Sequence, residues 1–251
     1  MTCDWNVLAV TTLARLLAPR GHVLVGTNAA AQMAGALLAR ELSGGRIRVS
    51  VIGSRKHSFL TDDLSEIFDC AARGRFDAFM IGGGQIDGQA NINLVGVGQH
   101  PRMQVRWSGS HGTPLLYLMI PNIIIFRERH TREVMVDKVD FISTPGTSPA
   151  EVYRPGGPTG MLTGKGVFSF DKRTARFRLE SLHPGIDLRD ILQNTGFAFD
   201  HDEAPAATAL PSNEVATLLR DAVCPEVAEI YPRFAQALSR GVDTHLAHAS
   251  S

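Results

Sequence analysis

The sequence predicts an α/β fold in which helices cover a largely parallel central sheet. Up to Ile81, short apolar segments typical of buried strands alternate with longer segments of helical periodicity, as in layered parallel sheets. Later in the chain, two alternating segments joined by a short turn predict a hairpin, so that we expect a C-terminal hairpin-helix unit. The 251 residues are 44% hydrophobic, which is enough for one full core.

The first helix is predicted over Asp4–Ala18, where apolar residues recur at helical spacing and the leading aspartate can cap the helix. The short apolar segment His22–Gly26 predicts a buried strand. Thr27 and Asn28 follow this strand and are expected to cap a second helix over the alanine- and leucine-rich segment Ala29–Glu41.

The next elements continue the alternation of strands and helices. Arg46–Ile52 predicts a strand, Asp62–Arg75 a helix and Phe76–Ile81 another buried strand. In open parallel sheets, ligands bind at the carboxyl ends of the strands. Asn28 and the segment Gly82–Asp87 both follow predicted strands, so we expect them to face one crevice.

The middle of the chain mixes apolar and charged segments. Leu115–Ile120 and Asn122–Phe126 are strongly apolar and predict buried elements. The charge-rich segment Arg127–Lys138 is expected to be solvated, and Gly156–Lys165, which is rich in glycine and proline, is expected to be a loop.

The last part of the chain is predicted to contain a hairpin, a helix and a tail. Gly166–Asp171 and Arg176–Ser181 alternate around a short turn and predict the hairpin. Ser212–Ala222 predicts a capped helix, after which the pattern is lost and we expect a loosely packed or partner-binding tail. We therefore divide the chain into an α/β domain over residues 1–200 and a linker, helix and tail over residues 201–251.

The segment Ile81–Gly98 contains the densest group of candidate binding residues. Gly82–Gly84 allow backbone conformations and close ligand approach that other residues forbid. Polar side chains then alternate, and in an extended segment they would share one face suited to a neutral polar or carbonyl group. They are Gln85, Asp87, Gln89, Asn91 and Asn93. A second interpretation is a glycine-rich turn between two strands, in which the amides satisfy buried backbone groups.

Composition excludes several classes of function. Lys+Arg 25 balances Asp+Glu 25, so no excess positive charge favours nucleic acid or an anionic membrane surface. The cysteines Cys3, Cys70 and Cys224 are widely separated, show no zinc-ligand spacing and cannot all pair, which indicates a reduced, cytoplasmic setting. The N-terminus shows no basic-then-apolar signal pattern, and no apolar run is long enough to span a membrane.

Several motifs resemble the second subunit of family I CoA-transferases, in particular the glutaconate CoA-transferase type. The signature is carried by Gly83, Gly84, Gln85, Ile86, Asp87, Asn91 and Asn93. Gln89-Ala90 replaces the usual Tyr-Gly of that signature. The resemblance implies a CoA-transferase-like layered fold for residues 1–200.

Three later segments extend the resemblance. Gly109-Ser110-x-Gly112 is similar to the family's second glycine-rich loop, whose N–H groups can stabilise an oxyanion, and His111 takes the place of a glycine. Asp137–Gly146 is similar to a family segment that implies a strand followed by a proline turn. His183–Phe197 is similar to the family's closing pattern of a turn, a helix and Asn-Thr-Gly-Phe.

One departure from the family pattern bears on the reaction. In the family, the strand equivalent to Arg46–Ile52 leads to a glutamate that carries CoA as a thioester. Alignment on Gly53 puts Val51 in place of this glutamate, and Gly44–Leu60 contains no Asp or Glu. A valine cannot act as the covalent nucleophile. The chain is in this respect similar to the two-subunit ring-cleaving CoA-thioester hydrolases of steroid catabolism, which use an acid from the partner subunit.

The candidate catalytic residues are two histidines. His57 ends the basic cluster Arg55-Lys56-His57, which either contacts CoA phosphates or a substrate carboxylate, with His57 as acid or base, or forms an ordinary solvated loop. His111 either polarises a carbonyl group or fills space in a tight turn. The residues expected to bind substrate are Asn28, Gly82, Gly83, Gly84, Gln85, Asn91, Asn93, Gly109, Ser110 and Gly112.

The resemblance implies an enzyme built from two kinds of subunit. We expect an alpha-type partner, an α2β2 assembly, no metal and no permanently bound cofactor, with CoA entering as part of the substrate. The first hypothesis is a hydrolase that breaks a thioester or a ring C–C bond with an acid/base from the partner. The alternatives are an authentic CoA-transferase and a non-catalytic subunit that binds acyl-CoA or stabilises its partner.

Overall fold

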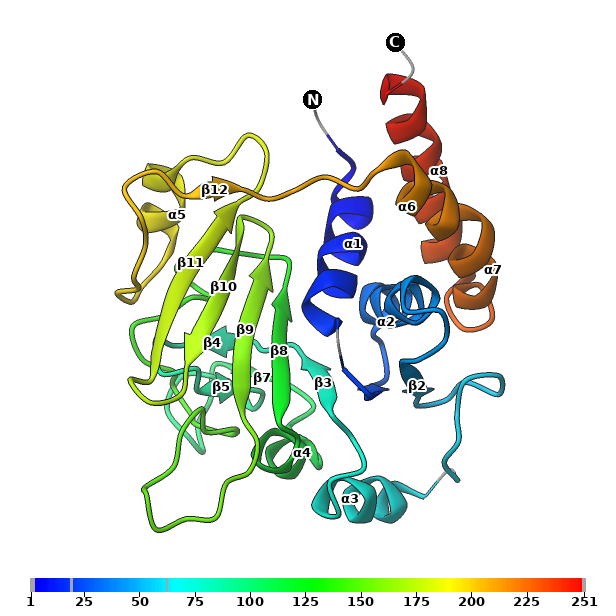
Figure 1. Cartoon of the computed structure of the whole chain (residues 1–251). Helices are drawn as coiled ribbons and strands as arrows, with labels where there is room; N and C mark the ends of the chain where they lie inside the picture. The colour runs from blue at the N-terminus through cyan, green and yellow to red at the C-terminus, as the bar shows by residue number, and fades with distance from the viewer. Residues whose placement is uncertain (1–2, 19, 62, 250–251) are drawn as a thin grey trace. The chain divides into compact units, whose positions relative to one another are not determined.

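The computed structural model describes residues 3–18, 20–61 and 63–249. The chain forms two compact units (Figure 1). Unit 1 comprises Met1–Ile67, Arg75–Met80 and Ala209–Ser251, and unit 2 comprises Phe68–Gly74 and Ile81–Thr208. Unit 1 is therefore assembled from both ends of the chain.

The sheet of unit 1 is parallel, as the alternation of strands and helices predicts. Strand β1 (His22–Val25) lies between β2 (Arg48–Val51) and β3 (Ala78–Ile81). Val25 pairs with Val51, and Leu24 pairs with Phe79, in parallel register. The three strands are short and almost entirely buried, which explains their continuous apolar sequences.

Two helices of unit 1 follow the sequence prediction, but the second is capped differently. In α1 (Trp5–Leu17), the Asp4 carboxylate accepts hydrogen bonds from the first turn, as predicted. Helix α2 (Ala30–Leu42) begins after Ala29, and no side chain caps it, so the prediction that Thr27 and Asn28 cap it is wrong. Asn28 instead adopts a left-handed conformation, with φ of 52°, and turns the chain after β1.

The C-terminal segment is a packed helical layer, where the sequence pattern predicts a loosely packed tail. Helix α6 (Asn213–Leu218) has the predicted Ser212 cap. The π-helical turn η1 (Leu219–Val223), α7 (Cys224–Val227) and α8 (Pro232–Ala249) follow. Leu238 and Val242 of α8 are fully buried, and α8 contacts α1. Their four-residue spacing gives α8 one apolar face, and α8 packs against α1, α6, η1 and α7.

Unit 2 contains a mixed sheet. Its order is β12 (Ala206–Ala207), β11 (Arg176–Leu182), β10 (Gly166–Asp171), β9 (Pro158–Thr163) and β8 (Asn122–Arg127). The β8–β9 and β11–β12 pairs are parallel, whereas β10 is antiparallel to both neighbours. The predicted hairpin over residues 166–181 is confirmed. The buried element predicted over Asn122–Phe126 is strand β8, whose Ile123, Ile124 and Ile125 are buried.

Three sequence predictions in unit 2 are wrong. The segment predicted as a glycine-rich loop contains β9, because Gly160 lets β10 approach: a Cβ there would lie 2.8 Å from the Phe168 carbonyl oxygen. Asp137–Gly146 contains no strand, and an isolated antiparallel β-bridge joins its Thr144 to Ile92. Val134 and Met135 are buried, although the charges of their segment predict solvent exposure.

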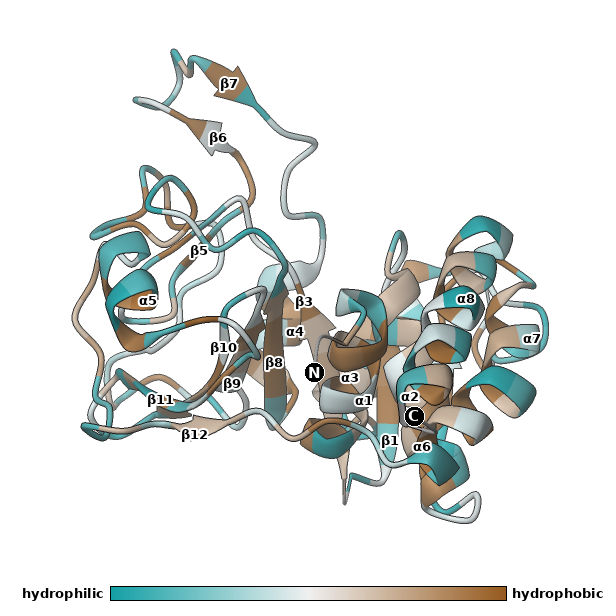
Figure 2. Cartoon of the chain, turned by 90° about the horizontal axis from the view of Figure 1, so that it is seen from above, coloured by the Kyte–Doolittle hydropathy of each residue, from teal (hydrophilic) through white to brown (hydrophobic). Residues whose placement is uncertain are grey.

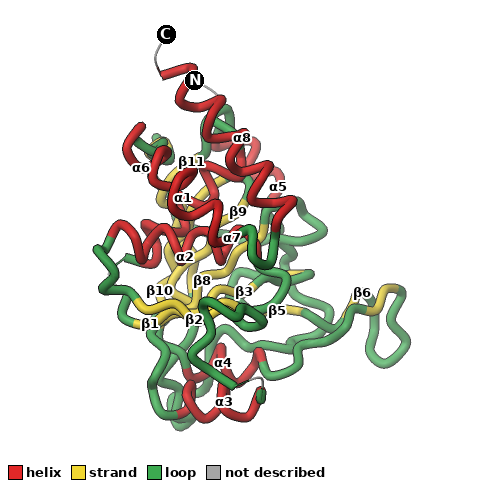
Figure 3. The backbone as a smooth tube through the Cα atoms, turned by 90° about the vertical axis from the view of Figure 1, so that its right-hand side faces the viewer, coloured by secondary structure: helices red, strands yellow, loops and turns green. Residues whose placement is uncertain are grey.

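The remaining elements of the chain are short. Helices α3 (Leu64–Ala72), α4 (Thr113–Met119) and α5 (Leu188–Asn194) are present, and Asp187 caps α5 through the Asp190 N–H. Strand β4 (Gln85–Ile86) pairs with β5 (Ile92–Asn93), and β6 (Gly96–Val97) pairs with β7 (Val105–Arg106). The β6–β7 hairpin extends away from the other strands of unit 2 (Figures 2 and 3). No helix in the described ranges is both long and apolar enough to cross a bilayer.

We expect acid to destabilise unit 2 through His130. This imidazole is 3% exposed, and its ring nitrogens contact the Thr163 and Thr195 hydroxyls at 2.8 and 2.9 Å. Burial and the nearby Lys165 charge lower the pKa of His130 to about 4. The unfolded chain takes up this proton near pH 6.5 and the folded chain does not, so stability falls by about 3 kcal/mol between pH 7 and pH 4.

Urea unfolding at a series of pH values measures this effect. The His130→Gln variant keeps hydrogen-bonding capacity at the site but cannot titrate, so its free energy of unfolding should depend less on pH across this interval. An identical pH dependence in the two proteins would contradict the assignment to His130.

Candidate functional site

The turns after β1 and β2 meet at one edge of unit 1. Val25 pairs with Val51 at the ends of the two strands, and the Ile52 N–H donates to the Val25 carbonyl at 3.0 Å. Asn28 is exposed in the turn after β1, and Gly53 turns the chain after β2 with φ of 86°. This is the carboxyl edge of the parallel strands, where the sequence predicts a ligand site.

Val51 ends β2 and has no exposed surface. Its side chain therefore packs within the unit, at the position where the sequence resemblance predicts a glutamate in related proteins. The chain then folds back, because the Val51 N–H donates to the His57 carbonyl at 2.8 Å. The turn carries no carboxylate of its own.

A carboxylate does reach this turn from the C-terminal segment. Glu229 accepts hydrogen bonds from the Ser54 hydroxyl at 2.7 Å and from the Arg55 and Lys56 N–H groups at 2.8 and 3.1 Å. Partial burial raises the pKa of Glu229, but these three hydrogen bonds outweigh it and hold the pKa below its ordinary value. Glu229 is therefore an ionised carboxylate bound by the turn after β2.

Two neighbours of Glu229 also reach the loops of the sheet edge. The Tyr231 hydroxyl accepts a hydrogen bond from the Ala29 N–H at 3.1 Å, at the turn after β1. Glu226 lies 2.8 Å from His57 Nε2 and 3.8 Å from Lys56 Nζ. We name Glu226, Glu229 and Tyr231 the C-terminal clamp, because together they bind both turns.

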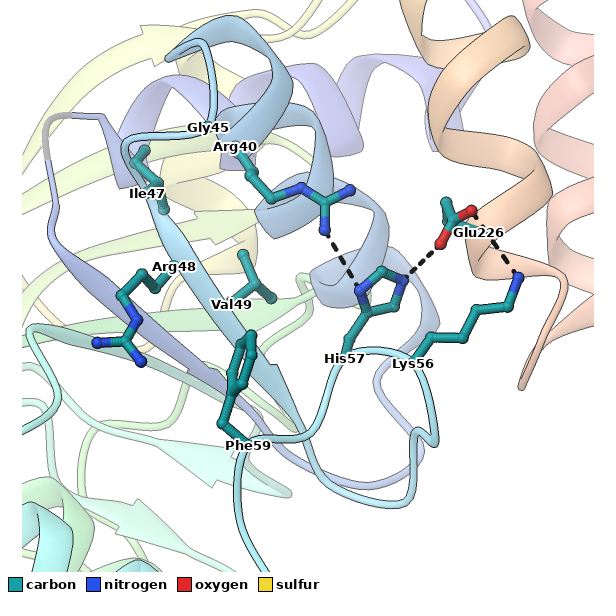
Figure 4. A pocket seen from close by; sticks show the side chains of 9 residues that line it. All are labelled: Arg40, Gly45, Ile47, Arg48, Val49, Lys56, His57, Phe59 and Glu226. Atoms are coloured by element: carbon teal, nitrogen blue, oxygen red, sulfur yellow. Dashed lines mark hydrogen bonds and ion pairs between the residues drawn. The ribbon is translucent and has the colours of Figure 1, made fainter.

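A cavity of about 430 Å³ lies beside β2, and Glu226 is one of its lining residues (Figure 4). Arg40 at the end of α2 points at His57 from one side, and Glu226 faces it from the other. The lining residues are Arg40, Gly45, Ile47, Arg48, Val49, Lys56, His57, Phe59 and Glu226.

The charges in this cavity are largely compensated within the chain. Arg40 can only donate, so its 3.3 Å contact makes His57 Nδ1 an acceptor, while Glu226 lies close to Nε2 but out of line with it. The other nitrogens of Arg40 bind Glu41. Nδ1 of His57 is thus engaged by Arg40, whereas Nε2 has only the ion-pair contact with Glu226 and no hydrogen bond. The burial of the imidazole between these two charged side chains favours a structural role. Arg48 lies over the Phe59 ring at 5.5 Å.

The three glycines after β3 make room for side chains of unit 2. A Cβ on Gly84 would lie 2.1 Å from the Trp107 ring, and a Cβ on Gly83 would lie 2.7 Å from Ile92. Gly82 is less crowded, with the Phe126 carbonyl oxygen 3.4 Å from a Cβ position. The indole therefore packs directly on the glycine backbone.

The amide-rich segment is a hairpin, so the prediction of one extended polar face is wrong. Gln85 pairs with Asn93 across β4 and β5. The side-chain oxygen Oε1 of Gln85 accepts from Asn93 Nδ2 at 2.7 Å and from the Asp140 N–H at 3.0 Å. The Asn93 oxygen in turn accepts from the Val95 and Gly96 N–H groups. These amides satisfy backbone groups, as the second interpretation of this segment proposes.

The turn of this hairpin is fixed in the same way. Asp87 accepts hydrogen bonds from the Gln89 and Asn91 N–H groups and from the Asn91 amide. The Asn91 oxygen accepts from the Gly146 N–H at 2.9 Å. Asp87 and Asn91 are buried, and Gln89 is exposed.

The second glycine-rich loop precedes α4 in unit 2. Gly109 and His111 have positive φ values of 96° and 45°, and the His111 side chain is exposed. Gly112 packs on Phe68, whose ring would lie 1.9 Å from a Cβ. The Ser110 carbonyl accepts from the Thr113 N–H at 2.9 Å. His111 is thus presented to solvent from a turn that glycine shapes.

The structure brings Asn28, Val51 and His57 together in unit 1, and the two glycine-rich loops belong to unit 2. The single crevice expected for Asn28 and Gly82–Asp87 stays a prediction. Among residues 3–18, 20–61 and 63–249, no group of three or more His, Cys, Asp or Glu side chains is arranged to hold a metal ion.

Comparison with known protein families shows to which family this chain belongs. The family described as coenzyme A transferase matches residues 6–194. The chain belongs to the coenzyme A transferase family. This membership agrees with the sequence resemblance and with the α/β fold of the structure.

Two curated relatives share about a third of their residues with the chain over the matched part. The B subunit of glutaconate CoA-transferase from Acidaminococcus fermentans is 32% identical over 157 residues, which are 60% of this chain and 58% of that relative. The cholesterol ring-cleaving hydrolase IpdB subunit of Rhodococcus jostii is 31% identical over 166 residues, 64% of each chain. The chain thus spans less than two thirds of either relative.

The crystal structure of Rhodococcus jostii IpdAB shares the CoA-transferase fold with this chain. It superposes with a TM-score of 0.78 at 22% identity and covers 90% of this chain and 96% of the other. The C-terminal clamp lies beyond residue 194, outside the family match.

Sequence reasoning missed the C-terminal clamp. One signal pointed to it: Glu226 and Glu229 lie three residues apart, a spacing that puts side chains on one face of a helix. The basic cluster Arg55-Lys56-His57 lies in the segment Gly44–Leu60, which contains no Asp or Glu. Charge complementarity between these two segments could have suggested the contact.

Proposed function

We propose that the chain is the beta-type subunit of a heteromeric enzyme that hydrolyses an acyl-CoA thioester or cleaves a ring C–C bond in one. The observation that carries this proposal is Val51: a buried valine ends β2 where the family resemblance calls for the nucleophilic glutamate. Without that carboxylate the chain cannot form a covalent CoA adduct there. An acid/base from an alpha-type partner would then activate water.

The relatives support a second kind of subunit. Each of the two is named as one subunit of its enzyme, the glutaconate CoA-transferase and the ring-cleaving hydrolase. We propose an α2β2 assembly with CoA carried only as part of the substrate and no permanent cofactor. The cysteines Cys3, Cys70 and Cys224 are unpaired, which favours a cytoplasmic setting for the assembly.

The glycine-rich loops supply the binding groups in this proposal. The Gly84 N–H donates to the Asn93 carbonyl at 3.0 Å, so the candidates to stabilise the oxyanion that forms when activated water adds to the carbonyl carbon are the other main-chain N–H groups of Gly82–Gly83 and Gly109–Gly112. In thioester hydrolysis the C–S bond then breaks, the sulfur takes a proton and a carboxylic acid leaves. Gln85, Asn91 and Asn93 fix the first of these loops through their hydrogen bonds, and exposed His111 is a candidate to polarise the substrate carbonyl. Asn28, exposed in the turn after β1, is a candidate substrate-binding residue of unit 1.

Thiol release with and without the partner tests the proposal. We expect the isolated chain to be inactive and the reconstituted complex to release free thiol from an acyl-CoA, or to cleave its ring, without an acceptor acid. Robust turnover by the isolated chain would refute the requirement for a partner.

The two alternatives predict different results. An authentic CoA-transferase requires an acceptor acid, and borohydride added after acyl-CoA would reduce its glutamyl-CoA intermediate and inactivate it. A non-catalytic subunit would leave the partner's turnover unchanged when it is added.

A further inference from the structure

We propose that Glu229 is a positioning residue that holds the turn after β2 in the conformation that the acyl-CoA site requires. This inference rests on the proposed function. It assigns a role to a segment that lies beyond residue 194, where the family match ends.

The Glu229 carboxylate is fully used by one turn. One oxygen accepts from the Arg55 and Lys56 N–H groups, and the other accepts from the Ser54 hydroxyl. Two successive N–H groups that converge on one anion form a compact nest, which a carboxylate fills better than a neutral group. Because both oxygens are engaged, Glu229 is poorly placed to attack a thioester.

The hydrogen bonds continue from Glu229 to the strand end. The Ser54 hydroxyl also accepts from the His57 N–H at 2.8 Å, and the His57 carbonyl accepts from the Val51 N–H at 2.8 Å. A chain of direct contacts thus joins Glu229 to the end of β2. A displacement of the Glu229 carboxylate would therefore shift this series of hydrogen-bonded groups and, with it, Gly53 and Val51.

Tyr231 gives the same segment a second attachment. Its hydroxyl accepts from Ala29 N–H at 3.1 Å, immediately after the exposed Asn28. The two turns follow adjacent parallel strands, and ligands bind at such an edge. Residues 229–231 therefore set the spacing of two loops at the candidate site.

The test compares Glu229→Gln and Glu229→Ala in the complex with the alpha-type partner. Glutamine has one accepting oxygen in place of two, so it can accept from the Arg55 and Lys56 N–H groups or from the Ser54 hydroxyl but not from both. We therefore expect kcat for acyl-CoA hydrolysis to fall about tenfold in Glu229→Gln and on the order of 100-fold in Glu229→Ala, with a smaller change in KM. Tyr231→Phe should act in the same direction. The matched control is Glu214→Gln, an exposed carboxylate of α6 away from the turns, which should leave kcat unchanged.

Amide hydrogen exchange gives a readout that does not depend on activity. In Glu229→Gln, the Arg55 and Lys56 amides should exchange faster, while the amides of α1 keep their protection. Faster exchange with unchanged kcat would overturn the positioning role, and so would unchanged exchange. If the wild-type complex turns over no acyl-CoA, the proposed function is what fails, and exchange still decides whether Glu229 holds this turn.

Discussion

Replacing Val51 by glutamate should destabilise the protein by about 4 kcal/mol at pH 7, and it should not create a CoA-transferase. The Val51 side chain has no exposed surface, so the new carboxyl group would be buried among apolar residues. A buried glutamate with no partner has its pKa raised by several units. The unfolded chain would ionise it near pH 4.3, so the penalty grows as pH rises above that value.

Val51→Gln is the matched control, because it has the same shape and no charge. Urea unfolding of both variants at pH 5 and pH 7 measures their free energies of unfolding. At pH 7 the glutamate variant should be less stable than the glutamine variant, and this difference should be smaller by roughly 2–3 kcal/mol at pH 5. Borohydride treatment after acyl-CoA addition should leave the Val51→Glu protein unlabelled. A stable Val51→Glu protein that is inactivated by borohydride would show that this position does face the substrate.

Truncating Asn93 to alanine should cost about 3–4 kcal/mol of stability. The side chain has no exposed surface and makes four hydrogen bonds. Its Nδ2 donates to Gln85 Oε1 and the Gly96 main-chain carbonyl, and its Oδ1 accepts from the Val95 and Gly96 N–H groups. Gln85 Oε1 would keep its hydrogen bond from the Asp140 N–H, but alanine would remove the partner of the Gly96 carbonyl and of the Val95 and Gly96 N–H groups. Each buried group left without a partner costs about 1–3 kcal/mol unless the structure relaxes.

The exposed amide of Gln89 in the same hairpin provides the control. Its only hydrogen bond through the side chain in the described residues is a 3.5 Å contact with Asn91, so Gln89→Ala should change the free energy of unfolding by less than about 0.5 kcal/mol. Thermal or urea unfolding of the two variants measures the difference. Equal stabilities would mean that the Asn93 network is replaced by water in solution.

Much of the fold follows from local patterns in the sequence. The strand His22–Val25, the Asp4 cap and the hairpin over residues 166–182 are all encoded by neighbours in the chain, and all were predictable. The strand Pro158–Thr163 was not, because its glycines signal a loop locally and become useful only when β10 packs against them.

The candidate site was less predictable for the same reason. The glycines and amides could be recognised as a set from the sequence, but their roles depend on distant partners. Gln85 is fixed by Asp140, and the turn after β2 by Glu229, which follows it by more than 170 residues. Local sequence patterns depend only on neighbouring residues, so they cannot predict contacts between residues that are far apart in the sequence.

The assembly of unit 1 from both ends of the chain has a consequence for biosynthesis. During translation, α1 and the first strands leave the ribosome long before α8, which packs on α1 and contributes the buried Leu238 and Val242. Most of unit 2 lies between α1 and α8 in the sequence, so unit 2 can finish folding before α8 has been synthesised. The apolar surface of α1 that α8 covers must therefore stay exposed until α8 has been synthesised.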